Sequence, residues 1–251
     1  MLRATGRITR VLKKGLPNGF RGVYKINIVG STGSGKTTFL KCLLGDLFKP
    51  TSEAKRRSAV ENSVDSTHTW FRIGNKQKTE STTTISLNTA GILLIRTLFN
   101  SIEFHPINKA EELLLRDDIE DIYQLMFFDT PGQERFDFMP EITMRGADAV
   151  IVLVDGTNMS SVGKVSFFLE LARKEEYRSS DGANRIPMLI LLNKSDLATH
   201  GAYLGLDSIK HMIGEDPKYD FYETSMVNKE GVDDSIRGLM SRLEEGIIER
   251  E

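Results

Sequence analysis

The sequence predicts a doubly wound α/β fold, in which helices cover both faces of a mostly parallel β-sheet. Three observations predict it. An apolar run over residues 23–29 is followed by a glycine-rich turn and then by an apolar run that begins at Phe39 with helical spacing. The segment 149–154 is apolar at every position, which is typical of a parallel strand buried on both faces. Strand-like and helix-like segments also alternate along the chain, as βαβ units require.

Local periodicity places the remaining elements. Further strands are expected over 85–95, 102–104, 122–128, 187–192 and 219–223. Helices are expected from 39 to about 49, and over 110–115, 161–174, 206–213 and 232–247. In folds of this kind ligands bind at the carboxyl ends of the strands, so motifs in those positions are the candidates for function.

Composition and charge describe an ordinary soluble globular protein. Hydrophobic residues make up 39% of the 251 residues, charged residues make up 27%, and the formal net charge is −2, which gives no sign of nucleic-acid binding. We expect a basic N-terminal arm over 1–22 and a single domain over 23–251, with inserts at about 51–80 and 100–119. The arm has basic but no acidic residues, which favours a solvated tail; contact with an acidic lipid surface or an acidic partner is the alternative.

The sequence also bears on the cellular compartment. Cys42 is the single cysteine, so there is no disulfide framework and a reducing interior is expected. No apolar run approaches the ~20 residues that span a bilayer. The ends of the sequence carry no signal peptide, myristoylation glycine or prenylation cysteine. We therefore expect a cytoplasmic protein, with peripheral membrane contact without a lipid anchor as the alternative.

The glycine-rich turn fits the pattern G-x-x-x-x-G-K-[ST], a P-loop. Gly30 and Gly35 let the backbone curl so that its N–H groups point at a phosphate. Lys36 is expected to reach the β- and γ-phosphates, Thr37 to bind Mg²⁺ through its hydroxyl, and the following helix to aim its positive end at the same anion. The predicted phosphate-binding residues are Gly30, Ser31, Thr32, Gly33, Ser34, Gly35, Lys36, Thr37 and Thr38.

A second motif, Asp-Thr-Pro-Gly-Gln-Glu over residues 129–134, directly follows an apolar run. Asp129 at a strand end can hold Mg²⁺ through the water shell of the ion. Gly132 has no side chain, so its N–H can approach the terminal phosphate, and Gln133 can orient an attacking water. Taken alone, the first four residues would be an ordinary turn.

The third motif is Asn-Lys-Ser-Asp over residues 193–196, after the strand expected at 187–192. Guanine presents two N–H donors that the Asp196 carboxylate can accept together, whereas adenine presents the wrong edge. Asn193 can brace the site, and the aliphatic stem of Lys194 can cover the base. Asparagine and aspartate also cap helices, so this string is only moderately specific by itself.

Two weaker signals complete the set. Backbone N–H groups at Ser225 and Met226, after the last strand, can meet the guanine carbonyl oxygen. Thr84 ends a long polar loop and can complete the coordination of Mg²⁺, with Thr82 and Thr83 as alternatives. The metal ligands expected from the sequence are therefore Thr37, Thr84 and Asp129.

Together, and in this order, these motifs resemble the Ras-like small GTPases, and the segment 129–136 looks most like the Rab and Arf branches. The resemblance implies a six-stranded sheet with one antiparallel edge strand, Mg²⁺ as cofactor and GTP or GDP as ligand. It implies slow hydrolysis with Gln133 and Lys36 as catalytic residues, and switch loops around Thr84 and Gln133. It also implies protein effectors, an exchange factor and a GTPase-activating partner.

The chain departs from the family pattern in three places. The loop before Thr84 is much longer than usual, Thr32 stands where many relatives have glycine, and Met226 replaces a small alanine. Two other functions compete with a GTP-hydrolysing switch: a nucleotide-bound scaffold that hardly hydrolyses GTP, which need not retain Gln133, and a P-loop kinase, against which the motif at 193–196 argues. The two inserts are expected to form the partner surface; a disordered decoration is the alternative.

Overall fold

The computed structural model describes residues 19–44, 88–113, 115–132, 138–178, 186–200, 203–214 and 216–248. Most of the predicted basic arm, the insert at 51–80, Thr82, Thr83, Thr84 and Gln133 lie outside the described residues. Within the described residues, no helix is long and apolar enough to cross a membrane.

The strands form one sheet in the order β3-β2-β4-β1-β5-β6-β7. Their bounds are β1 Phe20–Gly30, β2 Asn88–Thr97, β3 Ile102–Pro106, β4 Ile119–Asp129, β5 Ala149–Asp155, β6 Met188–Asn193 and β7 Tyr219–Thr224. The pairs β1–β5, β5–β6 and β6–β7 are parallel, and β2–β3 is antiparallel. The α/β class with a mostly parallel sheet is therefore confirmed.

The six strands that the family resemblance implies are one too few, because the sheet has seven. The additional strand is β3, which lies in the segment 100–119 that the sequence marked as an insert. Its register with β2 pairs Leu94 with Phe104, so the insert extends the edge of the sheet. The first strand also starts at Phe20, three residues before the expected position, and takes the last residues of the predicted arm.

The helices follow the predicted order with three additions. Their bounds are α2 Lys36–Leu44, η2 Ile107–Lys109, α4 Ala110–Leu113, α5 Phe138–Met144, α6 Met159–Gly163, α7 Val165–Arg178, η4 Ser195–His200, α8 Leu206–Ile213 and α9 Val232–Ile248. The helix expected over 161–174 is two helices, α6 and α7, which meet at Gly163 and Lys164. The short elements η2, α5 and η4 were not predicted.

The described chain divides into two compact units. One contains residues 19–24 and the described part of 89–127; the other contains residues 25–44, residue 88 and the described part of 128–248. All predicted site residues that the structure describes belong to the second unit.

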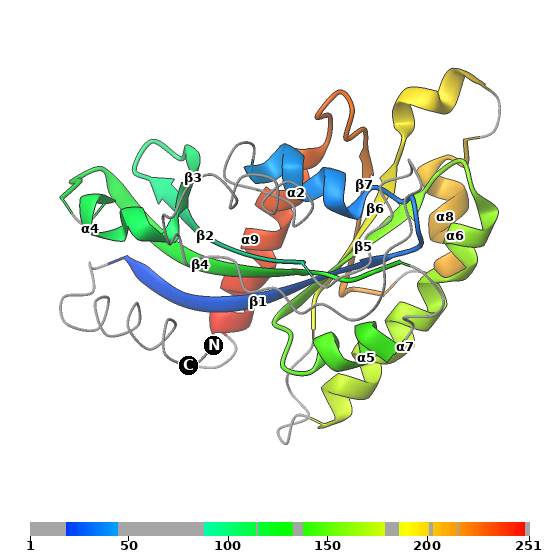
Figure 1. Cartoon of the computed structure of the whole chain (residues 1–251), viewed down its shortest axis with the longest axis horizontal. Helices are drawn as coiled ribbons and strands as arrows, with labels where there is room; N and C mark the ends of the chain where they lie inside the picture. The colour runs from blue at the N-terminus through cyan, green and yellow to red at the C-terminus, as the bar shows by residue number, and fades with distance from the viewer. Residues whose placement is uncertain are drawn as a thin grey trace, which may run out of the picture. The chain divides into compact units, whose positions relative to one another are not determined.

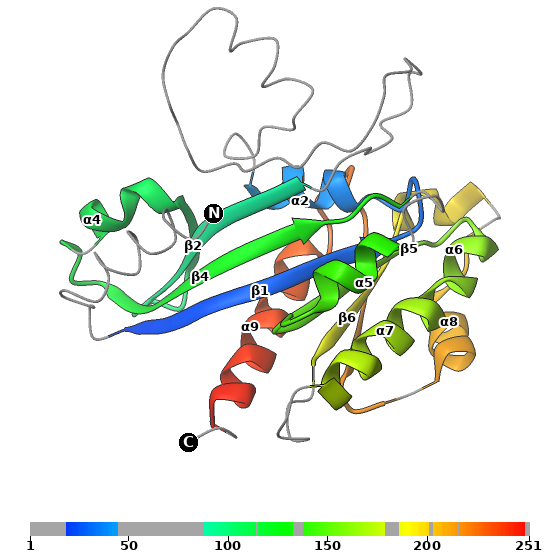
Figure 2. The same cartoon turned by 60° about the horizontal axis from the view of Figure 1, so that its bottom comes forward.

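Both faces of β5 and β6 are covered in the second unit. Alternate positions such as Val152 and Ile190 pack in one hydrophobic cluster with Phe168 of α7. The intervening positions, such as Leu153, point to the opposite face, because side chains alternate along a strand. There α9 packs on β6 and β7 and also contacts α2. Figures 1 and 2 show α5 and α7 side by side, apart from α9, so the sheet is covered by helices on both sides.

The segment 100–119 contributes to the core of the first unit. Ile107, Ala110 and Leu113, from η2 and α4, pack in a buried cluster with Leu93, Ile95 and Ile122. Arg116 adds ion pairs to Glu103 and Asp118 within the same segment. This packing contradicts the alternative that the segment is a disordered decoration; its expected role as a partner surface stays a prediction.

Leu113→Ala is expected to destabilise the protein by about 2–4 kcal/mol, because it empties space in a packed cluster. Leu113 is 4% exposed, whereas Leu115, two residues later, is 85% exposed. Leu115→Ala is the matched control, with an expected change within about 0.5 kcal/mol. Urea unfolding of both variants measures the difference, and equal midpoints would show that the insert does not share in the cooperative fold.

Candidate functional site

The turn after β1 has the backbone conformation that its glycines permit. Gly30, Gly33 and Gly35 have φ values of 149°, 77° and 106°, which disfavour residues with a Cβ atom. A Cβ atom on Gly30 would also collide with the carbonyl oxygen of Leu153 on β5. The turn leads directly into α2, whose first residue is Lys36. Strand, glycine turn and helix therefore follow one another as the P-loop motif predicts, and the N-terminus of the helix lies directly after the turn.

Lys36 is buried under this turn, with 5% of its surface exposed. Its Nζ donates hydrogen bonds to the carbonyl oxygens of Gly30 and Ser31, each at 2.9 Å. Burial lowers the pKa of Lys36 to about 8; the nearby charge of Asp129 opposes this shift and that of Lys164 adds to it. A buried ammonium of this kind is stabilised by an anion, so the site suits a polyphosphate.

Asp129 and Thr37 bring two oxygen ligands together beside the P-loop. Asp129 is the fully buried last residue of β4, and its Oδ2 accepts a hydrogen bond from Thr37 Oγ1 at 2.9 Å. The described residues contain no cluster of three or more histidine, cysteine or acidic side chains able to hold a metal ion. A carboxylate and a hydroxyl fit Mg²⁺, a hard cation that keeps several waters and takes further ligands from substrate phosphates.

Gly132 lies against the P-loop. A Cβ atom at this position would come within 2.6 Å of Lys36 Nζ and of the backbone nitrogen of Thr32, so only glycine permits the approach. A cavity of about 230 Å³ opens beside it and is lined by Gly30, Pro131, Gly132, Pro140, Gly163, Lys164, Phe167 and Phe168.

Three further residues of the P-loop motif, Thr32, Gly33 and Thr38, are exposed. Gln133, the next residue after Gly132, lies outside the described residues.

Asn193 connects three segments at the end of β6. Its Nδ2 donates to the carbonyl oxygen of Ser34 in the P-loop at 2.8 Å, and its Oδ1 accepts from the backbone N–H of Met226 at 3.2 Å. Asn193 is 3% exposed, and Ser34 is fully buried. The asparagine therefore braces the P-loop against the segment after β7, as its position in the third motif predicts.

The other residues of the third and fourth motifs meet in the same place. Ser225 Oγ donates to Asp196 Oδ1 at 2.7 Å, and Asn228 N donates to Ser225 Oγ at 3.2 Å. Ser225 thus fixes one oxygen of the carboxylate. Met226 is buried, and its carbonyl oxygen accepts from Cys42 Sγ of α2 at 2.9 Å, so Cys42 has a structural contact next to the site.

Two residues at the site were not predicted. Asp155, at the end of β5, accepts from Lys194 Nζ at 2.5 Å, and Ser161 of α6 contacts Ser31 of the P-loop through their hydroxyl groups at 2.7 Å. The sequence did contain a signal for Asp155: it directly follows the apolar run 149–154, and Asp129 likewise ends the strand β4. Ser161 gave none, since a serine in a helix is common.

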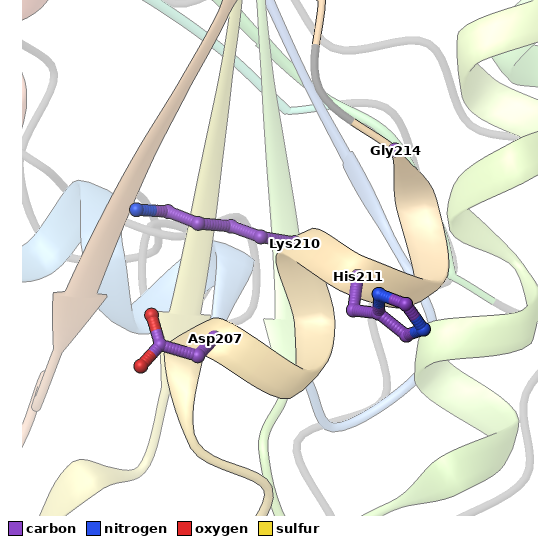
Figure 3. Close-up of a pocket in the computed structure, with 4 residues that line it drawn as sticks. All are labelled: Asp207, Lys210, His211 and Gly214. Atoms are coloured by element: carbon purple, nitrogen blue, oxygen red, sulfur yellow. The ribbon is translucent and has the colours of Figure 1, made fainter.

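A larger hollow of about 350 Å³ lies along α8, lined by Asp207, Lys210, His211 and Gly214. Figure 3 shows the three side chains spread along the helix rather than directed at one point. None of the predicted site residues lines it, so its size does not make it the functional site.

Comparison with known proteins places this geometry in a family. A model described as “Ras family” matches residues 95–245, more than half of the chain. The chain belongs to the Ras family. The match includes Asp129, Asn193, Asp196 and Ser225, whereas the P-loop precedes it and rests on its own motif and geometry.

Curated relatives agree with this family. The chain is 27% identical over 130 residues to the Ras-related protein Rab-32D of Dictyostelium discoideum, a match that covers 52% of this chain and 54% of the relative. It is 28% identical over 137 residues to the GTP-binding protein Rit2 of Mus musculus (55% and 59%) and 26% identical over 110 residues to the Ras-related protein Rab-34 of Homo sapiens (44% and 40%). The chain spans roughly half the length of these relatives. Membership of the Ras family supports, in general terms, a GTP-binding switch.

Proposed function

We propose that this protein binds Mg²⁺ and GTP and acts as a molecular switch that hydrolyses GTP slowly. The observation that carries the proposal is the bond from Asn193 to Ser34. This bond joins a loop suited to phosphates to the segment that carries Asp196, whose carboxylate accepts a hydrogen bond from Ser225 Oγ. In this proposal the two ends of a nucleotide bind at neighbouring places in one compact unit.

In the proposed complex each end of the nucleotide has its own set of residues. Lys36 and the P-loop backbone bind the β- and γ-phosphates, and Thr37 and Asp129 hold Mg²⁺, which neutralises phosphate charge. Asp196 accepts two N–H bonds from guanine and Lys194 covers the base. The N–H groups expected to face the guanine carbonyl oxygen are engaged within the protein, since Ser225 N donates to the carbonyl oxygen of Glu230 and Met226 N donates to Asn193 Oδ1.

The conformational part of the proposal concerns Gly132, Gln133 and Thr84. The N–H of Gly132 meets the γ-phosphate, Gln133 orients the attacking water, and Thr84 joins the Mg²⁺ ligands when GTP is bound. Loss of the γ-phosphate then releases both loops. Effectors would read this change, and an exchange factor and an activating partner would control it. The basic arm over 1–22 would supply any peripheral membrane contact.

The decisive experiment compares GTP and ATP in the presence and absence of Mg²⁺. Fluorescent GTP and ATP analogues are titrated into nucleotide-free protein, and inosine triphosphate, which lacks the exocyclic amino group, serves as the matched control. We expect tight binding of GTP, weaker binding of the inosine nucleotide and little binding of ATP. Equal affinities for GTP and ATP would refute the guanine assignment, and no change on chelation of Mg²⁺ would refute the metal site.

The low pKa of Lys36 predicts a pH dependence of nucleotide binding. In nucleotide-free protein its pKa is lowered to about 8 from 10.5, chiefly by burial, and bound phosphates would restore the charge. Binding must then take up a proton above pH 8, so GDP affinity should be constant below this pH and fall by up to about tenfold per pH unit above it.

The same lowered pKa affects stability. The free energy of unfolding of the nucleotide-free protein should rise with pH between about 8 and 10.5, because in this range the unfolded chain holds the Lys36 proton more tightly than the folded chain does.

Calorimetric titration of GDP between pH 7 and 9.5 measures this effect. The matched control is Lys41→Met, since Lys41 is an exposed lysine on the same helix, and its profile should equal that of the unaltered protein. A flat affinity up to pH 9.5 would mean that Lys36 stays charged without its ligand.

A further inference from the structure

Asp155 is a buried carboxylate that belongs to none of the predicted motifs. It ends β5 and is 6% exposed. Its Oδ1 accepts from both the backbone N–H and the hydroxyl of Thr157, at 3.0 and 2.7 Å. Its Oδ2 accepts from Lys194 Nζ at 2.5 Å. One oxygen therefore fixes the turn after β5, and the other holds the lysine of the proposed base site.

The backbone around this pair is closely fitted. The parallel register of β5 and β6 pairs Asp155 with Asn193, the residue before Lys194. Gly156 N donates to the carbonyl oxygen of Asn193 at 3.0 Å. Lys194 has a φ of 72°, a conformation that residues with a Cβ atom seldom adopt without local compensation. Its side chain therefore leaves the end of β6 in a fixed direction and ends on Asp155.

Asp155 also contacts the phosphate end of the site through its backbone. Its N–H donates to Ser161 Oγ at 2.9 Å, and Ser161 Oγ in turn accepts from Ser31 Oγ of the P-loop at 2.7 Å. Ser161 is 2% exposed. The residue thus has a side chain directed to the base site and a backbone linked to the P-loop, and the two can be separated experimentally.

We propose that Asp155 is a positioning residue, which holds the Lys194 ammonium so that the lysine stem lies across the guanine base and slows nucleotide release. The inference rests on the proposed function. Without the carboxylate, Lys194, whose side chain is 32% exposed, would lose its only anchor among the bonds described for its Nζ. The stem would then sample other rotamers and expose the base to water.

Asp155→Asn separates this role from a structural one. The amide oxygen of asparagine can still accept from Thr157 and preserve the turn, and the backbone bond to Ser161 is unchanged, but the negative charge that faces Lys194 is lost. Because charge-assisted bonds are stronger than neutral ones, we expect GDP to dissociate about tenfold faster from this variant. Asp155→Glu, which keeps the charge, should recover part of the slow release.

A double-mutant cycle tests whether Asp155 acts through Lys194. GDP release is measured by displacement of a fluorescent analogue from the unaltered protein, Asp155→Asn, Lys194→Met and the double variant. We expect the double variant to release GDP no faster than Lys194→Met alone. Thr157→Val is the matched control, because it removes a bond to Asp155 but leaves the ion pair, and its release rate should be unchanged. Multiplicative effects of the two substitutions, or an unchanged rate in Asp155→Asn, would overturn the proposal.

A ligand without a base separates the two ends of the site. Asp155→Asn should leave the affinity for inorganic tripolyphosphate with Mg²⁺ unchanged while it weakens the affinity for GDP. An equal loss for both ligands would overturn the proposal and assign Asp155 to the P-loop through Ser161. If the unaltered protein does not retain GDP at all, the proposed function itself fails; if it does and only the Asp155→Asn result is negative, the positioning role alone is refuted.

Discussion

Replacing Asp196 by asparagine is expected to weaken GTP binding on the order of 10⁴-fold, because a site built to accept two donor groups loses one acceptor and places an N–H against the guanine donors. The same variant should gain affinity for xanthine nucleotides, since xanthine carries a carbonyl group where guanine carries its amino group. Ser225 Oγ already holds Asp196 Oδ1 at 2.7 Å, so little reorganisation is needed for the carboxylate to accept a base.

Competition between fluorescent GDP and unlabelled GTP or xanthosine triphosphate measures this change of preference. Asp207→Asn is the matched control, because this carboxylate lies in the first turn of α8 and lines the separate hollow there; guanine affinity should not change. Unaltered GTP affinity in Asp196→Asn would show that the base binds elsewhere, whereas loss of all nucleotides would point to a defect of the fold.

The predictable part of the site consists of motifs that are short in sequence and end on buried strands. The runs before Asp155 and Asn193 are apolar at every position, so their identity as parallel strands followed from composition alone. Parallel strands bring their carboxyl ends to one edge, and this places Asn193 beside Ser34 although 159 positions separate them. The motifs, together with the rule that parallel strands end at one edge of the sheet, were therefore sufficient to predict that most of the site residues lie close together.

Features that depend on pairing between distant segments were not predictable. The strand β3 was recognised as a possible short strand, but its addition to the sheet depends on its register with β2 and on the burial of Leu113 under the same edge. The short helix α5 was not predicted; it contains Pro140 near its start, a residue that is tolerated in a first helical turn. The division between α6 and α7 at Gly163 and Lys164 is likewise invisible to periodicity, since both halves continue one apolar stripe.

The isolated protein is expected to hydrolyse GTP far more slowly than the ~10 s⁻¹ of a typical enzyme. Lys36 and Mg²⁺ can neutralise phosphate charge, but the sequence has no arginine between residues 73 and 84 that could approach the γ-phosphate from the loop before Thr84. In GTPases of this family an arginine supplied by a partner is worth about 10³ to 10⁵ in turnover, a magnitude known from the family itself. A large acceleration should therefore appear only when a partner or a second subunit adds one.

Gln133→Leu should abolish that stimulated turnover and leave GTP affinity nearly unchanged, because the glutamine is proposed to orient the attacking water and not to bind the nucleotide. Single-turnover hydrolysis of bound GTP, with and without the activating partner, separates the two effects, and a nucleotide-release assay on the same variant is the control for binding. Fast hydrolysis by the isolated protein would contradict the requirement for an external arginine. An unaffected Gln133→Leu variant with slow basal turnover would instead favour a GTP-bound scaffold, in which the bound nucleotide stabilises one conformation and its hydrolysis plays no part.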